Sequence, residues 1–256
     1  MKRLLLAFVC ALAAVAHGQQ PAPAPAPSPA ANPDAGFVPI FDGKTLTGWD
    51  GDPLYWRVED GNLVGEITAA TVIKRNTFII WRGGTPGDFE LKLEYRISAE
   101  GNSGVNYRSI ALDDAKWSLA GYQADIDGAR RNKSGVRYTG QNYEERGRTF
   151  LARRGQVARV AEDGKPIVIG TIGEEPELAR FIHEEDWNEL HIIARGNTLI
   201  HLLNGHVMSI VVDDDAAHRR ADGLIGVQVH VGPPMKVAYR NIRLKSLPPA
   251  ASHVVP

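Results

Sequence analysis

The sequence predicts an all-β protein, an antiparallel jelly-roll β-sandwich with one core. Apolar and polar residues alternate over most of the chain, most clearly in DFELKLEYRIS (88–98), which is the period of a strand. Two turn signals, Arg195-Gly196-Asn197 and Asn204-Gly205, divide residues 187–212 into hairpin strands. Only PELARFI (176–182) has the pattern of a helical turn or two. Many strands joined by short turns favour a sandwich, which we expect to be closed by pairing of the first and last strands.

Both ends of the chain differ in composition from the region between them. Residues 1–18 combine a basic start, an apolar run and a small-residue cleavage site, which predicts a secretory signal peptide. Residues 19–35 are rich in Pro and Ala, as in an extended linker. Residues 36–248 are expected to form the β-sandwich domain, followed by a tail over residues 249–256. The protein is therefore expected to be secreted or periplasmic.

Composition limits the classes of partner. The formal net charge is −1, and acidic and basic residues are interspersed, so we expect neither nucleic acid nor, for the mature form, a membrane as partner. The single cysteine, Cys10, lies in the predicted signal peptide. A mature chain without cysteine has no disulfide, and its stability must come from its core. The sequence leaves the oligomeric state open.

Polar side chains occupy alternate positions of four predicted strands, as in GYQADID (121–127). If the apolar residues point into the core, the polar ones converge on the opposite face. The residues predicted on this face are Glu94, Arg96, Asn102, Asn106, Arg108, Gln123, Asp125, Asp127, Gln228 and His230. Asn, Gln, Asp and His are poor strand formers, which favours a binding or catalytic site. The alternative is an ordinary solvated sheet face with cross-strand ion pairs.

Other polar residues give weaker signals. The spacing of His183 and His191 matches no zinc motif, and His201 and His206 are expected to face solvent beside their hairpin. The run from Asp125 to Gly128 is similar to the start of a calcium loop but lacks its later ligands. A further set lies on a predicted loop and either borders a sugar site or is solvated: Tyr143, Glu145 and Arg148.

Seven segments occur in the order found in one family. They are GFVPIFDGKTLTGW (36–49), WRVEDGNLVGE (56–66), DFELKLEYRIS (88–98), GNSGVNYRS (101–109), GYQADID (121–127), WNELHIIARGNTLIHLLNGH (187–206) and GVQVHVGPPMKVAYRNIRLK (226–245). Together they resemble the 3-keto-disaccharide hydrolase domain family. The resemblance implies a concanavalin A-like sandwich of the lectin/glucanase type, in a bacterial protein that cleaves glycosides oxidised at C3. Many relatives carry Glu and Gln where this chain has Gln123 and Asp125.

A ketone at C3 acidifies the C2 proton, so a base, an enolate stabiliser and an acid can together expel the C1 substituent. We predict His230 as the base, because its ordinary pKa is near neutral. Asp125 would orient it or hold a divalent cation with it, although no cofactor is certain. Arg108 or Arg96 would stabilise the enolate. The predicted sugar-binding residues are Asn102, Asn106, Gln123, Asp127 and Gln228.

Two other functions stay open. Glu94 with Asp125 or Asp127 would form the carboxylate pair of an ordinary glycoside hydrolase. Alternatively, the domain is a non-catalytic, lectin-like module, because the same fold often only binds glycans. Such modules use exposed aromatic residues, and the candidates are Trp49, Trp56, Trp81, Trp117 and Trp187.

Overall fold

The computed structural model describes residue 32 and residues 34–130 and 137–249. The predicted signal peptide, most of the predicted linker and all of the predicted tail except Pro249 lie outside the described residues. No helix in the described ranges is long and apolar enough to cross a membrane.

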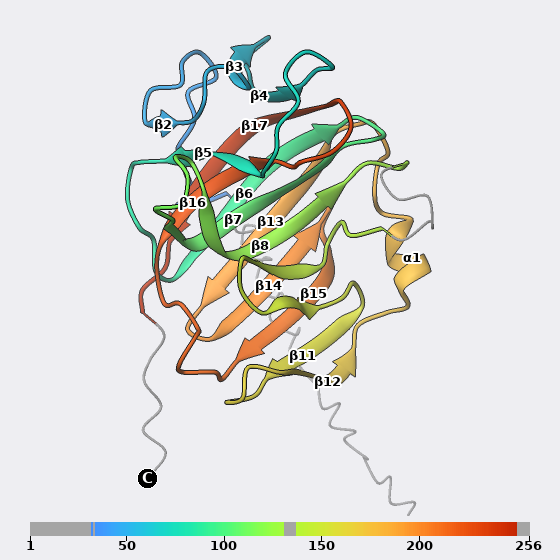
Figure 1. The fold of residues 1–256 in the computed structure, drawn as a ribbon. Helices are drawn as coiled ribbons and strands as arrows, with labels where there is room; N and C mark the ends of the chain where they lie inside the picture. Colours follow the sequence, from blue (N-terminus) through green and yellow to red (C-terminus); the bar gives the residue numbers. More distant parts are fainter. Residues whose placement is uncertain (1–31, 33, 131–136, 250–256) are drawn as a thin grey trace, which may run out of the picture. The chain divides into compact units, whose positions relative to one another are not determined.

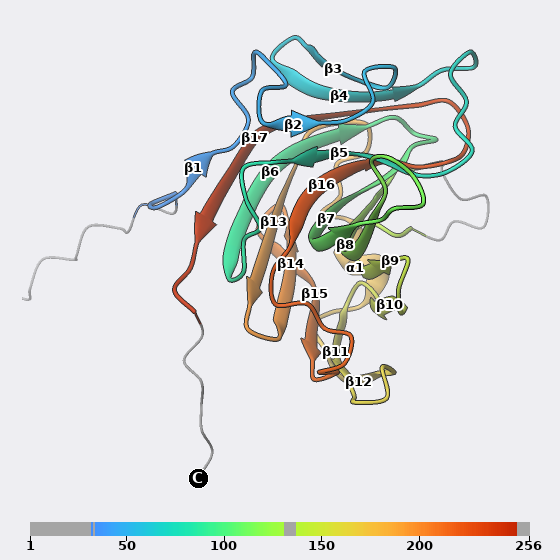
Figure 2. The same ribbon diagram turned by 60° about the vertical axis from the view of Figure 1, so that its left-hand side comes forward.

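The described residues from Gly36 onward form a two-layered β-sandwich (Figure 1). The first sheet has ten strands, in the order β12 (Pro166–Thr171), β11 (Gln156–Val160), β15 (His206–Asp213), β14 (Thr198–Leu203), β13 (Asn188–Arg195), β6 (Phe89–Ile97), β17 (Met235–Ser246), β4 (Asn62–Ile67) and β3 (Trp56–Glu59), with β1 (Val38–Pro39) also paired to β17. The second has seven, in the order β10 (Thr149–Ala152), β9 (Asn142–Glu145), β8 (Leu119–Asp127), β7 (Asn102–Ala111), β16 (Leu224–Val229), β5 (Thr77–Trp81) and β2 (Trp49–Asp50). Figure 2 shows β7, β8 and β16 in one layer and β6, β13 and β14 in the other.

The connections agree with the turn signals. Both predicted hairpins are present, because β13 pairs with β14 around Gly196 and β14 with β15 around Gly205. The first and last strands pair as expected, with Val38 opposite Leu244. In the described ranges one helix forms, α1 (Glu175–Ala179), which overlaps the first half of the segment expected to be helical, residues 176–182. The pairing of β11 with β15 is parallel, so the expectation of an antiparallel sandwich holds for every other pair described here.

The core lies between the inner faces of the two sheets. From β8, Tyr122, Ala124 and Ile126 point into it, as the alternation predicts. Tyr107 stacks on Tyr122 with ring centroids 5.7 Å apart. The tyrosine at position 239 keeps its hydroxyl paired, 2.6 Å from Ser103 Oγ. Burying large aromatic side chains with satisfied polar atoms is a main source of stability in a protein without disulfides. The other face of the seven-stranded sheet is left for the polar residues.

Candidate functional site

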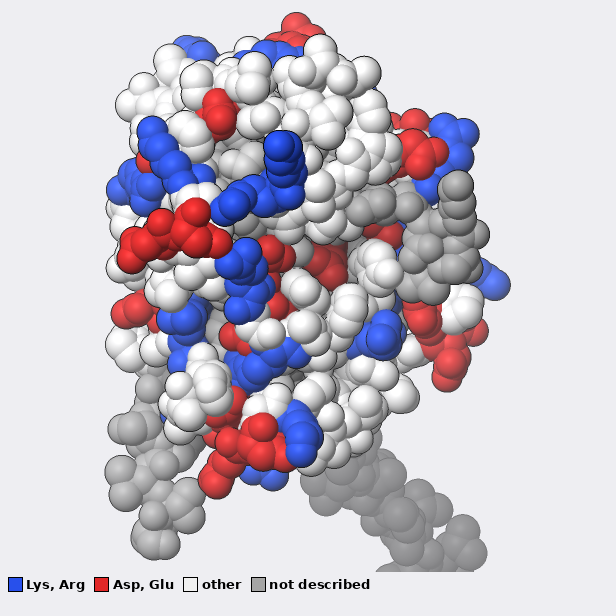
Figure 3. All heavy atoms as spheres, viewed as in Figure 1, with Lys and Arg blue, Asp and Glu red and all other residues white. Residues whose placement is uncertain are grey.

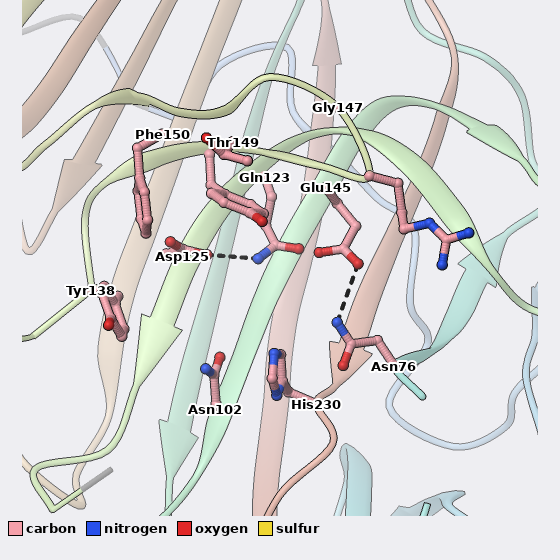
Figure 4. Close-up of a pocket in the computed structure, with 12 residues that line it drawn as sticks. Asn76, Asn102, Gln123, Asp125, Tyr138, Glu145, Gly147, Thr149, Phe150 and His230 are labelled. Carbon is pink, nitrogen blue, oxygen red and sulfur yellow. Dashed lines mark hydrogen bonds between the residues drawn. The ribbon is translucent and has the colours of Figure 1, made fainter. Parts of the chain in front are cut away.

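A polar pocket of about 340 Å³ lies on the outer face of the seven-stranded sheet. Figure 4 shows side chains from β7, β8, β9 and β10 and from the end of β16 converging on it. On this face of the molecule, Figure 3 shows acidic side chains recessed in a hollow with basic ones around it. The pocket is lined by Asn76, Asn102, Gln123, Asp125, Tyr138, Tyr143, Glu145, Arg146, Gly147, Thr149, Phe150 and His230.

Strand register explains why these side chains meet. Gln123 on β8 lies opposite Asn106 on β7 and opposite Tyr143 on β9, so all three share one face. Gly104 leaves room for this arrangement, because a Cβ there would lie only 2.5 Å from the side-chain carbon Cδ of Gln123. The sheet therefore accommodates the long amide only beside a glycine.

A chain of amides orients the carboxyl group of Asp125. Gln228 Nε2 donates to Gln123 Oε1 at 3.2 Å, and Gln123 Nε2 donates to Asp125 Oδ1 at 2.6 Å. Asp125 is 8% exposed. Burial raises the pKa of Asp125 well above its ordinary value, and the charges of Asp127 and Glu145 act in the same direction. The site therefore favours a protonated Asp125, which can donate a proton.

Glu145 on β9 supplies a second carboxyl group. Its Oε1 accepts a hydrogen bond of 3.2 Å from Asn76 Nδ2. Burial raises the pKa of Glu145, while the hydrogen bond from Asn76 opposes this shift. Asn76 is itself fixed, because its Oδ1 accepts a hydrogen bond from the backbone N–H of Val231 at 3.0 Å.

His230 follows β16 directly and presents an imidazole to the pocket. Its Nδ1 lies 2.6 Å from the backbone oxygen of Val231. A carbonyl oxygen only accepts hydrogen bonds, so Nδ1 carries the proton in this contact. In the neutral ring, Nε2 then keeps its lone pair and can act as a base.

An aromatic wall closes one side of the pocket. Tyr138 and Phe150 stack with centroids 5.7 Å apart, and Tyr143 meets the Phe150 ring edge-on at 5.0 Å. Such a wall presents apolar surface beside polar groups, a combination that suits a sugar ring. None of the five tryptophans, the aromatic candidates of the lectin-like alternative, lines this pocket.

The structure brings together only part of the predicted polar face. Asn102, Gln123, Asp125 and His230 line the pocket. Two other predicted sugar-binding residues, Asn106 and Gln228, are completely buried in the same sheet and do not line it.

Asp127 does not line the pocket either and is 1% exposed. Its carboxylate accepts hydrogen bonds from Thr139 Oγ1 at 2.6 Å and from the Tyr138 N–H at 2.9 Å. It therefore positions the backbone that carries Tyr138, in place of the predicted contact with substrate.

The placement of Glu94 and Arg96 beside these residues is wrong, because β6 belongs to the ten-stranded sheet. Glu94 accepts hydrogen bonds from Arg240 Nε at 2.8 Å and Asn241 Nδ2 at 2.5 Å. Arg96 lies over the ring of Trp187, 5.2 Å from its centroid. Strand parity gives the face of a residue but not the sheet to which its strand belongs.

Arg108 is also absent from the pocket, although its strand is correctly placed. The register of β7 shifts between Tyr107 and Ile110, and Arg108 has a φ of 44°. This irregularity turns its side chain away from the predicted face. The guanidinium is buried and donates to Gly196 O at 2.7 Å and to Asp88 Oδ1 at 2.9 Å. Arg108 thus ties loops together and stabilises no enolate in this pocket.

The residues 140–150 form a hairpin of strands β9 and β10, not the predicted loop. Tyr143 and Glu145 point into the pocket, and the four residues of NYEE are too few to have shown this from alternation. Arg148 instead pairs with Asp213 on β15. His201, expected in solvent, is completely buried and within 2.8 Å of the Tyr107 hydroxyl.

The described residues do not provide a donor set for a divalent cation. No group of three or more His, Cys, Asp or Glu side chains in the described ranges is arranged to hold one. Asp125 and His230, predicted as possible ligands, both line the pocket, but they belong to no such group.

The chain is a β-sandwich protein, and the family that its sequence matches is carbohydrate-active. A profile of the 3-keto-alpha-glucoside-1,2-lyase-like domain matches residues 36–245, and the chain belongs to this family. A search of curated protein sequences gave no match.

Solved structures share the fold at low sequence identity. Two candidate glycosyl hydrolases from Parabacteroides distasonis ATCC 8503 are similar. The first has 18% identity and a TM-score of 0.54, over 83% of this chain and 94% of that one. The second has 19% identity and a TM-score of 0.53, over 82% and 99%. A Bacillus subtilis protein of unknown function with a galectin-like fold has 14% identity and a TM-score of 0.52, over 80% and 92%.

Proposed function

We propose that the protein cleaves 3-keto-glycosides by removing the C2 proton and eliminating the C1 substituent. One observation carries the proposal: the same pocket holds an imidazole, whose Nδ1 is fixed by the backbone oxygen of Val231, and a carboxyl group that favours its protonated form. An elimination needs one base and one acid near the same sugar ring. Membership of the 3-keto-alpha-glucoside-1,2-lyase-like family supports this substrate class.

The steps follow from the chemistry of the ketone. His230 Nε2 takes the proton from C2, and the C2–H electrons form an enolate with the oxygen on C3. The enolate collapses to an enone as the C1–O bond breaks, and the departing oxygen receives the proton of Asp125. Water then adds, with its hydroxyl on C1 and a proton on C2, so the net reaction is hydrolysis.

The pocket amides replace the predicted arginines in this scheme. Asn76 and Asn102 line the pocket beside His230, and amide N–H groups can stabilise an enolate oxygen. The aromatic wall formed by Tyr138, Tyr143 and Phe150 would contact one face of the ring.

The test uses a 3-keto-glucoside and its unoxidised parent. We expect turnover of the oxidised substrate only, with loss of deuterium from a C2-deuterated sample and a primary isotope effect. His230→Ala should lower kcat by at least about 100-fold, the lower end for loss of a general base. Near-normal turnover by this variant, or product that keeps its C2 deuterium, would overturn the mechanism.

A second candidate is ordinary glycoside hydrolysis by two carboxyl groups. It is favoured by the presence of Asp125 and Glu145 in one pocket, in place of the predicted pair with Glu94. Cleavage of the unoxidised parent with retention of C2 deuterium would support it. Binding of both sugars without turnover would support the lectin-like alternative.

The expected secreted or periplasmic location is also a proposal. It is supported by the basic and apolar pattern of residues 1–18. Mass measurement of the protein purified from its native cells tests it, since export with cleavage should remove these residues.

A further inference from the structure

A second cavity of about 260 Å³ adjoins the pocket. The two share Asn76, Glu145, Arg146 and His230. The second cavity alone is lined by Arg75, Phe78, Ser118 and Val231. Together the two cavities form a groove over the outer face of the seven-stranded sheet.

The proposed base stands at the junction of these cavities. His230 borders both, as does Glu145 with its hydrogen-bonded partner Asn76. The bond that breaks joins C1 to the leaving group, and C1 is adjacent to the carbon that His230 deprotonates. A sugar ring held in the first cavity against the aromatic wall, with its C1-linked oxygen near Asp125, would therefore direct the rest of its leaving group into the second.

The two cavities differ in charge. Asp125 lines only the first, whereas Arg75 lines only the second. Arg75 and Arg146 share a single carboxylate, Asp114, whose Oδ2 lies 3.8 Å from Arg75 Nη1 and 2.7 Å from Arg146 Nη2. Among the described residues, Glu145 is the acidic residue that lines the second cavity, and it stands at the junction with the first, hydrogen-bonded by Asn76. Away from this junction, two guanidinium groups share one carboxylate, so cationic groups outnumber anionic ones there.

The floor of the second cavity is apolar. Phe78 is 1% exposed and packs with Ile80 and Leu119 in a small cluster on the outer face of the sheet. Val231 adds an apolar wall, and Ser118 is the hydroxyl side chain that lines it. A flat, partly apolar group with a negative charge at its outer end would match this combination.

We propose that the second cavity is the leaving-group subsite and that it selects a leaving group carrying a carboxylate. This inference rests on the proposed function, because it takes C1–O cleavage beside His230 as given. Arg75 is a specificity residue in this scheme. It contacts the carboxylate of the leaving group and takes no part in proton transfer.

The test compares two aryl 3-keto-glucosides, one with a para-carboxyphenyl and one with a para-carboxamidophenyl leaving group. Their leaving groups have similar shape and differ in charge. We expect kcat/KM to favour the carboxylate by about two- to five-fold at low salt, the range of one exposed ion pair. The preference should decline as salt shortens the Debye length from about 30 Å at 0.01 M to about 3 Å at 1 M.

Arg75→Gln should bring the two kcat/KM values together by lowering only the carboxylate value. Arg159→Gln is the matched control, because Arg159 lies on β11 of the other sheet, is similarly exposed and pairs with one acid, Asp214. This control should keep the preference.

Binding of the free leaving groups separates this proposal from the proposed function. The wild type should bind para-hydroxybenzoate more tightly than para-hydroxybenzamide in calorimetry, and Arg75→Gln should remove the difference. Turnover of both glycosides at equal kcat/KM would overturn the subsite and leave the elimination intact. Binding as expected without turnover of either glycoside would overturn the proposed function and leave the anion-selective cavity.

Discussion

Replacing Arg148 with glutamine should destabilise the fold and loosen the pocket wall. Arg148 joins the β9–β10 hairpin to the other sheet through Asp213, with Nη1–Oδ1 and Nη2–Oδ2 distances of 3.0 and 2.7 Å. Its Nε also donates to Glu144 Oε2 at 2.6 Å. Side-chain exposure is 11% for Arg148 and 1% for Asp213. Water therefore has little access to solvate the Asp213 carboxylate once the guanidinium group is removed.

Removing one partner of a buried ion pair costs roughly 3–5 kcal/mol, because the other charge stays buried. The Tyr122 hydroxyl, 2.5 Å from Asp213 Oδ2, still donates a hydrogen bond to that carboxylate in the variant. We therefore expect the free energy of unfolding to fall by about 3 kcal/mol, the lower end of this range. The free energy of unfolding falls by about 1–3 kcal/mol per M of urea, so the urea midpoint at pH 7 should fall by about 1 M or more.

Two comparisons make this prediction specific. Arg159→Gln, which removes an exposed partner of Asp214, should cost no more than about 1 kcal/mol. Arg148→Gln should also raise KM, because the hairpin that it releases carries Tyr143 and Glu145 into the pocket. A midpoint within experimental error of the wild type would refute the view that this ion pair holds the hairpin.

Three further predictions concern single titratable groups. Asp125→Asn should abolish turnover while leaving stability at neutral pH equal or higher. The raised pKa of Asp125 lets the native state hold a proton that the unfolded state has lost, so wild-type stability falls as pH rises above the ordinary value of 3.8. Thermal unfolding between pH 4 and 8 checks this, and a less stable variant at pH 7 would contradict it. His201→Gln should flatten the stability profile between pH 6.5 and 4, because burial lowers the pKa of His201 to about 4. Between pH 6.5 and 4 His201 binds a proton in the unfolded state and stays neutral in the native state, so wild-type stability falls as pH falls. Glu94→Gln should keep turnover within about two-fold, because Glu94 pairs with Arg240 on the other sheet. A large loss would return Glu94 to the list of catalytic candidates.

Sequence periodicity predicted the fold because each strand buries one face. The alternation in β8 assigned Tyr122, Ala124 and Ile126 to the core, and the turn glycines located the hairpins β13–β14 and β14–β15. The same parity correctly grouped Gln123 and His230, because β7, β8 and β16 are neighbours in one sheet.

The alternation of residues along one strand gave wrong or incomplete site predictions where the position depends on more than that strand. Nothing in a period of two tells which of two sheets receives β6, so Glu94 was grouped with the wrong residues. A register shift in β7 displaced Arg108, and no turn residue marks that shift in the sequence. Glu145 was left open between a site and a solvated loop because β9 has only four residues, too few for a clear alternation.

The burial of β8 argues against an ordinary solvated sheet surface. All nine of its residues are buried, including Gln123, Asp125 and Asp127 on the polar face. Nearby, the side-chain amide atoms of Asn106 hydrogen-bond to no described residue. A solvated face would leave these groups in water at little cost, whereas burial of a carboxyl group and unpaired amides opposes folding. The Asp127 carboxylate is stabilised by hydrogen bonds from the backbone N–H groups of Tyr138 and Thr139, whereas the Asp125 carboxyl group accepts one from the Gln123 amide and has a pKa raised by burial. The sequence thus retains at Asp125 a group that weakens the fold, which is the behaviour expected of a residue kept for chemistry.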